Sequence, residues 1–235
     1  MVGKWIPLES NPDLFNLWSE KMGLNLFDYR FHDIYGMDEE LLSLVPRPVE
    51  AVLFLFRLTE ENERLSREEE VEEEGGRLIW FKQLIGNACG TIALLHSILN
   101  SKASSSILPG SPLEKLLEES KLLKDGQARG ELLCGSEALE KVHQEIARLG
   151  EKEEEEDVDL HFVCFVRGGE EGDLIYLLDG RRKGPLLVVR SKEGGDPTKK
   201  GFLEETIDFV RKRYMEINPD EINFNLIALV GGQSS

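Results

Sequence analysis

Runs of apolar residues, each bounded by polar or glycine-containing turns, predict a series of buried strands. The run Ala51–Phe56 has no polar member, which is typical of a central strand covered on both faces. The other runs are rich in β-branched and aromatic residues, and they span 160–166, 174–178, 186–190 and 224–230. A glycine-rich turn at 168–172 separates the first two of these, so we expect an antiparallel hairpin there.

Apolar residues at helical spacing predict helices between these strands. The segment Asn11–Met22 combines a capping asparagine with a proline in its first turn. The run 90–99 is apolar on nearly every side and should be a buried helix, with Asn87 as its cap. A helix at 136–149 should carry His143 at its polar edge. Its buried residues are expected to be Leu139, Val142, Ile146 and Leu149, and further helices are expected at 38–44, from Ser111 onward and at 201–214.

Polar and charged segments predict the connections. They are an edge segment at 2–8, a turn-rich connection at 27–36, a charged surface loop or frayed helix at 59–76, and a polar loop at 101–106. Strands separated by helices, with one antiparallel hairpin, predict a mixed α/β or α+β fold. Because no internal repeat or linker is visible, residues 1–235 should form a single domain, with a core at about 5–230 and a flexible tail at 231–235.

One cysteine stands where a helix should begin. Cys89 opens the buried helix, and the positive end of the helix dipole there favours a thiolate. Free backbone N–H groups in that first turn can stabilise an oxyanion, and Gln83, six residues earlier, adds a side-chain donor. This local pattern fits a catalytic nucleophile, and it fits a small buried cysteine equally well.

A thiol nucleophile needs a base, and the base needs a group that orients it. His161 begins the first strand of the predicted hairpin and Asp179 follows the second, so both should lie at the same open end. The alternative for Asp179 is an ordinary turn aspartate before a glycine. Structural roles are favoured for the other three histidines, which are His32, His96 and His143.

Three blocks of the sequence resemble the active-site blocks of the ubiquitin C-terminal hydrolases, a family of cysteine peptidases. They are KQLIGNACGT at 82–91, VDLHF at 158–162 and LDGR at 178–181. Other segments are similar to the family in the same order, namely WIPLESNP at 5–12, YGMD at 35–38, LVPRPV at 44–49 and NPDEINFN at 218–225. The resemblance implies that Cys89 is the nucleophile, His161 the general base and acid, Asp179 the group that orients the histidine, and Gln83 an oxyanion donor.

The same resemblance implies a fold and a substrate. The fold would be a papain-like cysteine-hydrolase core, with a mainly antiparallel central sheet flanked by helices and a knotted backbone. The substrate would be ubiquitin, or its relative NEDD8, carrying a small adduct or short peptide that is released through a thioester. Residues expected to contact ubiquitin are Pro7, Leu8, Asp33, Leu160 and Phe162. A short loop with Glu151, Glu154 and Asp157 would cross over the active site, and the acidic stretch 68–74 departs from the family pattern.

Charge and composition narrow the partners further. The chain has 45 Asp and Glu against 28 Lys and Arg, a net charge of −17, which suits a basic partner and disfavours nucleic acid and anionic membranes. Its three cysteines show neither a disulfide framework nor metal-ligand spacing, so we expect no metal and no cofactor. With no leader or membrane-spanning stretch apparent, we expect a protein of a reducing compartment, the cytoplasm or nucleus. We also expect a monomer.

Two other functions stay open on the sequence alone. A ubiquitin-binding protein that holds free ubiquitin with little turnover could carry the same residues in a misaligned arrangement. A papain-like peptidase of general specificity would use the same nucleophile. The absence of a leader and of disulfides disfavours the peptidase.

Overall fold

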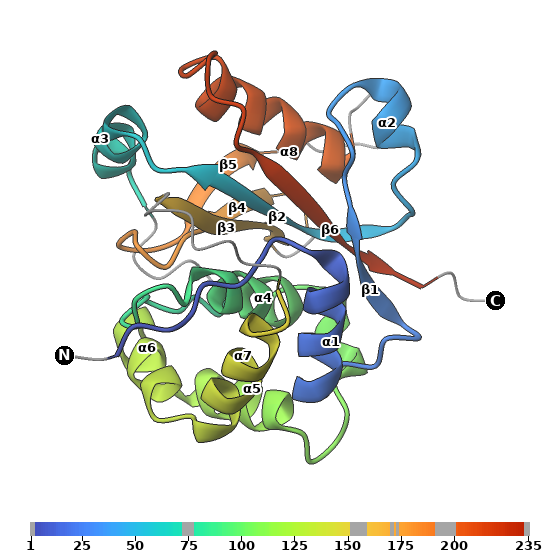
Figure 1. The fold of residues 1–235 in the computed structure, drawn as a ribbon, viewed down its shortest axis with the longest axis vertical. Coiled ribbons are helices and arrows are strands. Elements are labelled where there is room, and N and C mark those ends of the chain that lie inside the picture. The colour runs from blue at the N-terminus through green and yellow to red at the C-terminus, as the bar shows by residue number, and fades with distance from the viewer. Residues whose placement is uncertain are drawn as a thin grey trace.

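The computed structural model of this chain describes residues 3–71, 78–150, 159–169, 172, 174–190 and 201–232 (Figure 1). The helices are α1 Pro12–Met22, α2 Glu39–Ser43, α3 Glu60–Glu68, α4 Cys89–Leu99, the 3₁₀ turn η1 Lys102–Ser106, α5 Pro112–Leu122, α6 Gly126–Cys134, α7 Glu137–Ala147, α8 Phe202–Val210 and the π-helical turn η2 Arg211–Met215. The strands are β1 Tyr29–Asp33, β2 Val49–Arg57, β3 Leu160–Gly168, β4 Leu174–Leu178, β5 Leu186–Arg190 and β6 Asn225–Gly231.

Within the described residues the strands form one sheet of six, in the order β1-β6-β2-β3-β4-β5, and every neighbouring pair is antiparallel. The apolar run Ala51–Phe56 lies in β2, which pairs with β6 on one side and β3 on the other. The predicted central strand is therefore confirmed. The hairpin prediction is confirmed as well, because Cys164 to Gly168 of β3 pair with Leu174 to Leu178 of β4.

Successive residues of the central strands enter two separate hydrophobic cores. In β2, Ala51 and Leu53 belong to one core, whereas Val52 and Phe54 belong to the other. Side chains alternate across a strand, so a strand without polar members must be covered on both faces. Figure 1 shows the two coverings: α1, α4, α5, α6 and α7 lie below the sheet, and α2, α3 and α8 lie above it. The mixed fold of an antiparallel sheet between helices is thus confirmed.

Several helices begin where the sequence predicts a cap. Asn11 accepts the N–H of Asp13 at 2.9 Å, and Pro12 occupies the first turn of α1. Ser111 caps α5 in the same way and is followed by Pro112. At the other end of α1, Gly23 adopts φ +108°, and a Cβ there would lie 2.2 Å from the side chain of Ser111. Glycine is therefore required both by the left-handed turn and by the close approach.

Two elements, β1 and α6, were not predicted from the sequence, and a third, α3, was one of two alternatives. Strand β1 lies in the segment 27–36, which was expected to be turns; only Phe31 of its five residues is buried, so it lacks a strand's apolar pattern. Of the surface loop or frayed helix expected at 59–76, the structure has the helix over the first half, α3, and Thr59 caps it. Helix α6 has no amphipathic pattern because it packs through glycines: a Cβ on Gly126 would lie 1.9 Å from the Trp80 ring.

Other expectations are corrected in detail. The described part of the segment 2–8 forms no strand and makes one bridge, between Lys4 and Gly86. Leu149 is 56% exposed rather than buried, because α7 ends at Ala147. Cys134 is exposed at the end of α6. Part of the loop 101–106 is the 3₁₀ turn η1.

His143 lies in the interior, not at the polar edge of its helix. Its Nε2 lies 2.7 Å from the carbonyl of Ile6, and its Nδ1 lies 2.8 Å from the hydroxyl of Thr91. A carbonyl only accepts, so Nε2 carries the proton and Nδ1 accepts from Thr91 in the neutral ring. The Trp5 ring packs at 4.3 Å between centroids. One imidazole thus ties α7 to α4 and to the N-terminal segment.

None of the described helices has the length and apolar character to span a bilayer. The knotted path that the resemblance implies depends on the connections at 151–158 and 191–200, which lie outside the described residues. The knot therefore stays a prediction.

Candidate active site

Cys89 is the first residue of α4 and is buried, with only 8% of its surface exposed. The predicted cap is wrong: Ala88 holds the cap position, and no side chain caps the helix. Asn87 instead adopts φ +62°, and its side-chain N–H donates to the carbonyl of Trp5 at 3.0 Å. The first-turn N–H groups of α4 are therefore not consumed by a capping side chain, which leaves them available beside the sulfur.

His161 and Asp179 meet at the open end of the β3–β4 hairpin. The His161 Nε2 lies 2.7 Å from Asp179 Oδ1, and both residues are buried. Asp179 Oδ1 also accepts the backbone N–H of Arg181 at 2.8 Å. With Nε2 engaged by the carboxylate, Nδ1 of His161 is the nitrogen left for its hydrogen bond with Cys89. The structure thus brings together three residues that are far apart in the sequence.

Electrostatics in this buried group favour an ion pair. Burial alone raises the pKa of the Cys89 thiol, but the hydrogen bond and charge of His161 and the backbone groups of Phe162 and Gly90 outweigh it, and the pKa is lowered. For His161, burial lowers the pKa, while Asp179 and Cys89 together raise it to about 9. Burial raises the pKa of Asp179, but His161 and its other partners bring it to about 2. All three shifts favour the charged forms, a thiolate beside an imidazolium and a carboxylate.

Gln83 lines the same cleft as Cys89 and His161. The cleft has a volume of about 270 Å³ and is also lined by Leu58, Leu84, Ile85, Gly86, Asn87, Asp159, Leu160 and Arg181. One N–H of the Gln83 amide donates to the carbonyl of Ile85 at 3.2 Å, which leaves its second N–H for a ligand in the cleft. The sequence-predicted oxyanion donor is therefore at the site and held by its own loop.

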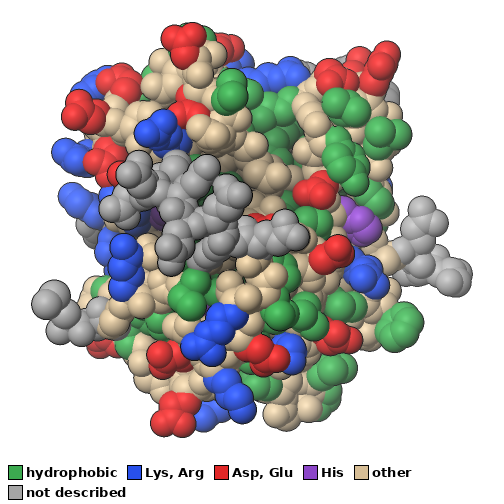
Figure 2. Space-filling view, in the orientation of Figure 1, with side chains coloured by type: hydrophobic (Ala, Val, Ile, Leu, Met, Phe, Trp, Pro, Cys, Tyr) green, Lys and Arg blue, Asp and Glu red, His purple; other side chains and the backbone are tan. Residues whose placement is uncertain are grey.

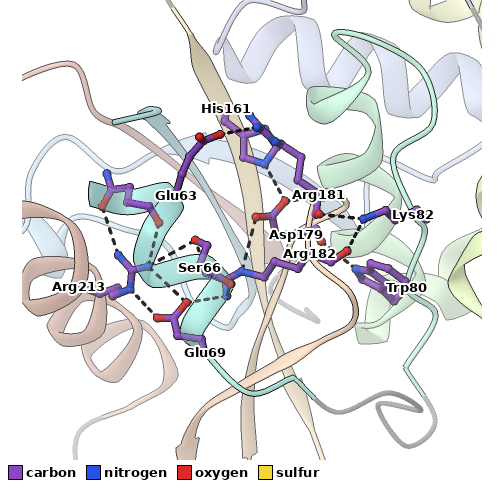
Figure 3. A network of polar contacts seen from close by, with 11 residues as sticks. Glu63, Ser66, Glu69, Trp80, Lys82, His161, Asp179, Arg181, Arg182 and Arg213 are labelled. Atoms are coloured by element: carbon purple, nitrogen blue, oxygen red, sulfur yellow. Dashed lines mark hydrogen bonds and ion pairs between the residues drawn. The ribbon is translucent and has the colours of Figure 1, made fainter. Parts of the chain in front are cut away.

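The segment that carries Gln83 is fastened to the loop that carries Asp179. The indole N–H of Trp80 donates to the Asp179 carbonyl at 3.1 Å. The Lys82 ammonium donates to the carbonyls of Arg181 at 2.8 Å and Arg182 at 2.5 Å. Figure 3 shows these contacts on one side of the acid. None of them was visible in the sequence, because they join side chains of one loop to the backbone of another.

The remaining histidines lie apart from the proton-transfer path. His96 Nε2 accepts the N–H of Phe81 at 3.0 Å, and burial lowers the His96 pKa to about 3, so the ring is neutral and supports the segment before Gln83. Burial, followed by the charge of Arg30, lowers the pKa of His32 on β1. His96 and His143 therefore have the structural roles that the sequence favoured.

The predicted ubiquitin contacts are divided between surface and interior. Pro7 and Leu160 are exposed, and Leu160 lines the cleft. Leu8 and Phe162 are buried and pack on the first turn of α4, where a Cβ on Gly90 would lie 3.1 Å from Leu8 and 3.4 Å from Phe162. Asp33 ends β1 on another part of the surface, beside a hollow of about 890 Å³. The predicted crossover residues Glu151, Glu154 and Asp157 lie outside the described residues.

The described part of the chain holds no group of three or more His, Cys, Asp or Glu side chains arranged to bind a metal. A second set of charges nevertheless lies behind the acid. Glu69, just after α3, pairs with Arg182 and Arg213 at 2.6 Å each. The sequence showed Glu69 only as part of an acidic run, and nothing in the pattern indicated its buried partners.

Comparison with known proteins identifies a family and relatives that the whole chain resembles. Residues 5–215 match the model of "Ubiquitin carboxyl-terminal hydrolase, family 1". Ubiquitin carboxyl-terminal hydrolase 3 of Arabidopsis thaliana is 36% identical over 230 residues, covering 96% of this chain and 94% of the relative. Ubiquitin carboxyl-terminal hydrolase YUH1 of Saccharomyces cerevisiae is 34% identical over 235 residues, covering 95% and 94%.

A solved structure shares the fold. The catalytic domain of Trichinella spiralis UCH37, crystallised bound to ubiquitin vinyl methyl ester, superposes with a TM-score of 0.76 at 28% identity. The match covers 98% of this chain and 97% of that one. The likeness therefore extends over the sheet and both helical layers and is not confined to the three sequence blocks.

Proposed function

The chain belongs to family 1 of the ubiquitin carboxyl-terminal hydrolases, and we propose that it cleaves small adducts or short peptides from the C-terminal glycine of ubiquitin through a thioester on Cys89. It is an enzyme of the cysteine-type deubiquitinating class. The observation that carries the mechanism is the assembled group of Cys89, His161 and Asp179, of which Cys89 and His161 line a cleft.

The first half of the reaction forms the thioester. The Cys89 thiolate attacks the carbonyl carbon of the terminal glycine, and the second N–H of Gln83 together with the Cys89 backbone N–H stabilises the oxyanion. The imidazolium of His161 gives its proton to the leaving amine or thiol as the C–N or C–S bond breaks. Asp179 holds the ring in place and stabilises its charge without taking the proton.

The second half regenerates the thiolate. Neutral His161 takes a proton from a water molecule as that water attacks the thioester carbonyl. The carbon–sulfur bond breaks, ubiquitin leaves with a carboxyl group that gives its proton to solvent, and Cys89 is again a thiolate beside an imidazolium. The mechanism uses only groups of this protein and a water molecule, so we propose no cofactor.

A second surface fits the body of the substrate. Asp33 lies beside the hollow of about 890 Å³, and two exposed apolar side chains line the same hollow, Tyr35 at 75% and Ile222 at 86% exposure. In Figure 2, hydrophobic side chains gather at the upper right, in the part of the view where Figure 1 shows α2. An apolar patch with a carboxylate at its rim suits a partner that is basic around an apolar centre.

The alternative of a ubiquitin-holding protein with little turnover requires a misaligned site. The aligned His161–Asp179 pair and the lowered pKa of Cys89 support turnover instead. The proposal includes NEDD8 as a second substrate, because the same cleft residues would contact the C-terminal tail of ubiquitin or of NEDD8.

The proposal is tested with a fluorogenic amide of the ubiquitin C-terminus, alongside the matching NEDD8 amide and a fluorogenic dipeptide. We expect turnover of the ubiquitin amide, weaker or equal turnover of the NEDD8 amide, and none of the dipeptide. Ubiquitin vinyl methyl ester should label Cys89, located by peptide mass spectrometry. Tight binding of ubiquitin without turnover or labelling would replace the proposal with the holding function.

A further inference from the structure

Arg182 is a buried cation directly behind the acid of the site. Its side chain is 2% exposed, and its guanidinium lies between Glu69 at 2.6 Å and Asp179 at 3.6 Å (Figure 3). Arginine is rarely buried to this degree without an anionic partner. Because the Arg182 guanidinium lies between the two carboxylates, a displacement of Glu69 can displace Asp179 as well.

The two oxygens of Asp179 have different partners. Oδ1 accepts from His161 at 2.7 Å and from the N–H of Arg181 at 2.8 Å. Oδ2 faces Nε of Arg182 at 3.6 Å, and that Nε is a buried donor without a hydrogen-bond partner among the described residues. A buried donor without a hydrogen bond costs stability, so its presence in a folded protein calls for an explanation. Its direction toward Oδ2 indicates that the explanation concerns Asp179.

Helix α3 holds Arg182 from the other side. The Ser66 hydroxyl accepts from Arg182 at 3.0 Å. Glu69 is shared with Arg213, which donates to Glu69 at 2.6 Å and to the side chain of Asn62 at 3.2 Å. Arg182 therefore fixes the α3 segment against the loop after β4, and Arg213 fixes it against η2.

The charges of this cluster balance only when the acid is ionised. Arg182 and Arg213 are two buried cations, and Glu69 supplies one negative charge between them. Asp179 supplies the second negative charge, while His161 and Cys89 together are neutral as an ion pair. The cluster behind the acid and the site in front of it are therefore one electrostatic unit.

We propose that Arg182 is a positioning residue of this active site, which holds the second carboxylate oxygen of Asp179 and is itself held by Glu69 and Ser66 of the α3 segment. Helix α3 and its acidic C-terminal end thereby set the geometry of the His161–Asp179 pair. The expected change in kcat rests on the proposed function, whereas the expected changes in pKa do not.

Removing the positive charge of Arg182 should shift the pKa of each titratable group in the site. Without Arg182, the protonated forms of Asp179, His161 and Cys89 all become relatively more favourable, so their pKa values rise. Removing the negative charge of Glu69 has the opposite sign, because Arg182 is then less neutralised. Several titratable and charged groups face Asp179. They are His161 from β3, His96 from α4, Lys82 from the segment that precedes α4, Tyr214 from η2, and Arg182 from the loop that carries Asp179 itself.

The experiment compares Arg182→Met and Glu69→Gln with two matched controls on α3. Arg64→Met and Glu68→Gln make the same changes in an exposed ion pair, whose side chains are 53% and 58% exposed. Each variant is first checked for its thermal midpoint. Alkylation of Cys89 by iodoacetamide is then followed from pH 4 to 10 by peptide mass spectrometry, without ubiquitin. The kcat and KM values for the ubiquitin amide are measured over the same range.

The rate of Cys89 alkylation plotted against pH has an acidic limb and an alkaline limb. We expect Arg182→Met to move both limbs to higher pH by about half a unit or more. Its kcat should fall about tenfold while KM stays within about twofold, because the group acts through Asp179 and not on bound substrate. Glu69→Gln should move the limbs downward by a smaller amount. Arg182→Lys, which keeps the charge, should restore the parental limbs, and both controls should match the parent.

Parental limbs in a folded Arg182→Met protein would overturn the inference and leave Arg182 with a structural role. If Arg182→Met does not fold, the comparison of Glu69→Gln with Glu68→Gln tests the inference. Glutamine keeps the size of glutamate and an oxygen that can accept from the arginines, so the Glu69 variant should fold. Identical limbs in these two variants would overturn the inference. The alkylation assay needs no ubiquitin. Shifted limbs in a protein that turns over no ubiquitin amide would therefore remove the proposed function and keep the inference.

Discussion

The backbone N–H of Gln83 donates to the carbonyl of Gly180 at 2.9 Å. This bond joins the segment that supplies the oxyanion donor to the loop that supplies the acid, and the contacts of Trp80 and Lys82 with the neighbouring carbonyls extend it. A Cβ on Gly180 would lie 2.9 Å from Cβ of Gln83, so glycine is what permits this approach. The donor and the acid are consequently positioned as a pair.

Lys82 is the polar side chain that makes most of this connection. Lys82→Met keeps the length of the stem and removes the donors to the carbonyls of Arg181 and Arg182. We expect kcat/KM to fall about tenfold, since two charge-assisted hydrogen bonds that align the two loops are lost. Lys115→Met, an exposed lysine of α5 paired with Glu119, is the matched control and should be neutral. Equal rates for the two variants would show that the loops align without Lys82.

Cys89→Ala should abolish turnover while ubiquitin binding is retained, because the sulfur bonds to substrate and alanine leaves the cleft open. A loss of at least about 10³-fold is expected for a nucleophile of this kind. Cys134→Ser and Cys164→Ala are the controls, since Cys134 is exposed on α6 and burial raises the pKa of Cys164 well above its ordinary value. Turnover in Cys89→Ala above that limit would place the nucleophile elsewhere.

The pH dependence follows from the pair His161–Asp179. The imidazolium persists up to the His161 pKa of about 9, so the alkaline limb of kcat/KM should lie near pH 9. Burial lowers this pKa and the charge of Asp179 raises it, so Asp179→Asn should move the limb downward by roughly two pH units. The rate should also fall by about 10² or more. An alkaline limb that stays near 9 in Asp179→Asn would mean that another group sets it.

The parts of the site that depend on local sequence could be predicted. Cys89 at a helix start, and His161 and Asp179 at the ends of paired strands, follow from apolar periodicity and from the turn between the strands. Their association needs only that the hairpin and the buried helix pack together, which one hydrophobic core ensures. Assignment of their roles still relied on the resemblance to a family.

The parts that depend on long-range polar contacts could not be predicted. Asn87 was expected to cap α4, but a more favourable bond to the carbonyl of Trp5 is available only in the folded protein. The acidic residue Glu69 looked like its neighbours in sequence, and its buried arginine partners are more than a hundred residues away. The spacing of apolar residues predicts which side chains are buried, but it does not predict which charged side chains form ion pairs.

Substrate binding should weaken as the ionic strength rises, because a chain of net charge −17 meets a basic partner. Asp33→Ala should raise KM for the ubiquitin amide more than it lowers kcat, since Asp33 lies beside the hollow near Tyr35 and away from the cleft. Glu118→Ala on α5 removes the same charge from an exposed position and is the control. A KM that is constant from low to high salt would remove the electrostatic argument.

The connection 151–158 is expected to limit the size of the leaving group. It joins Gly150, after α7, to Asp159, which lines the cleft and whose carbonyl accepts the N–H of Leu58 at 2.7 Å. Eight residues span at most about 28 Å when fully extended. We therefore propose that a connection of this length, anchored at Asp159 in the cleft, passes a short peptide, an amine or a thiol but excludes a folded protein.

Lengthening the connection tests this size limit directly. An insertion of ten Gly and Ser residues after Glu154 has a small thermodynamic cost, because each doubling of a loop costs only about 0.6 kcal/mol. Turnover of the small ubiquitin amide should remain nearly unchanged, and the variant should gain cleavage of diubiquitin or a ubiquitin–protein fusion. The control replaces residues 151–157 by a Gly and Ser segment of equal length, which removes the acidic charge without adding reach, and it should gain no such cleavage. A parent that already cuts folded conjugates as fast as small adducts would show that the connection is not a gate, and the restriction to small adducts would fail with it.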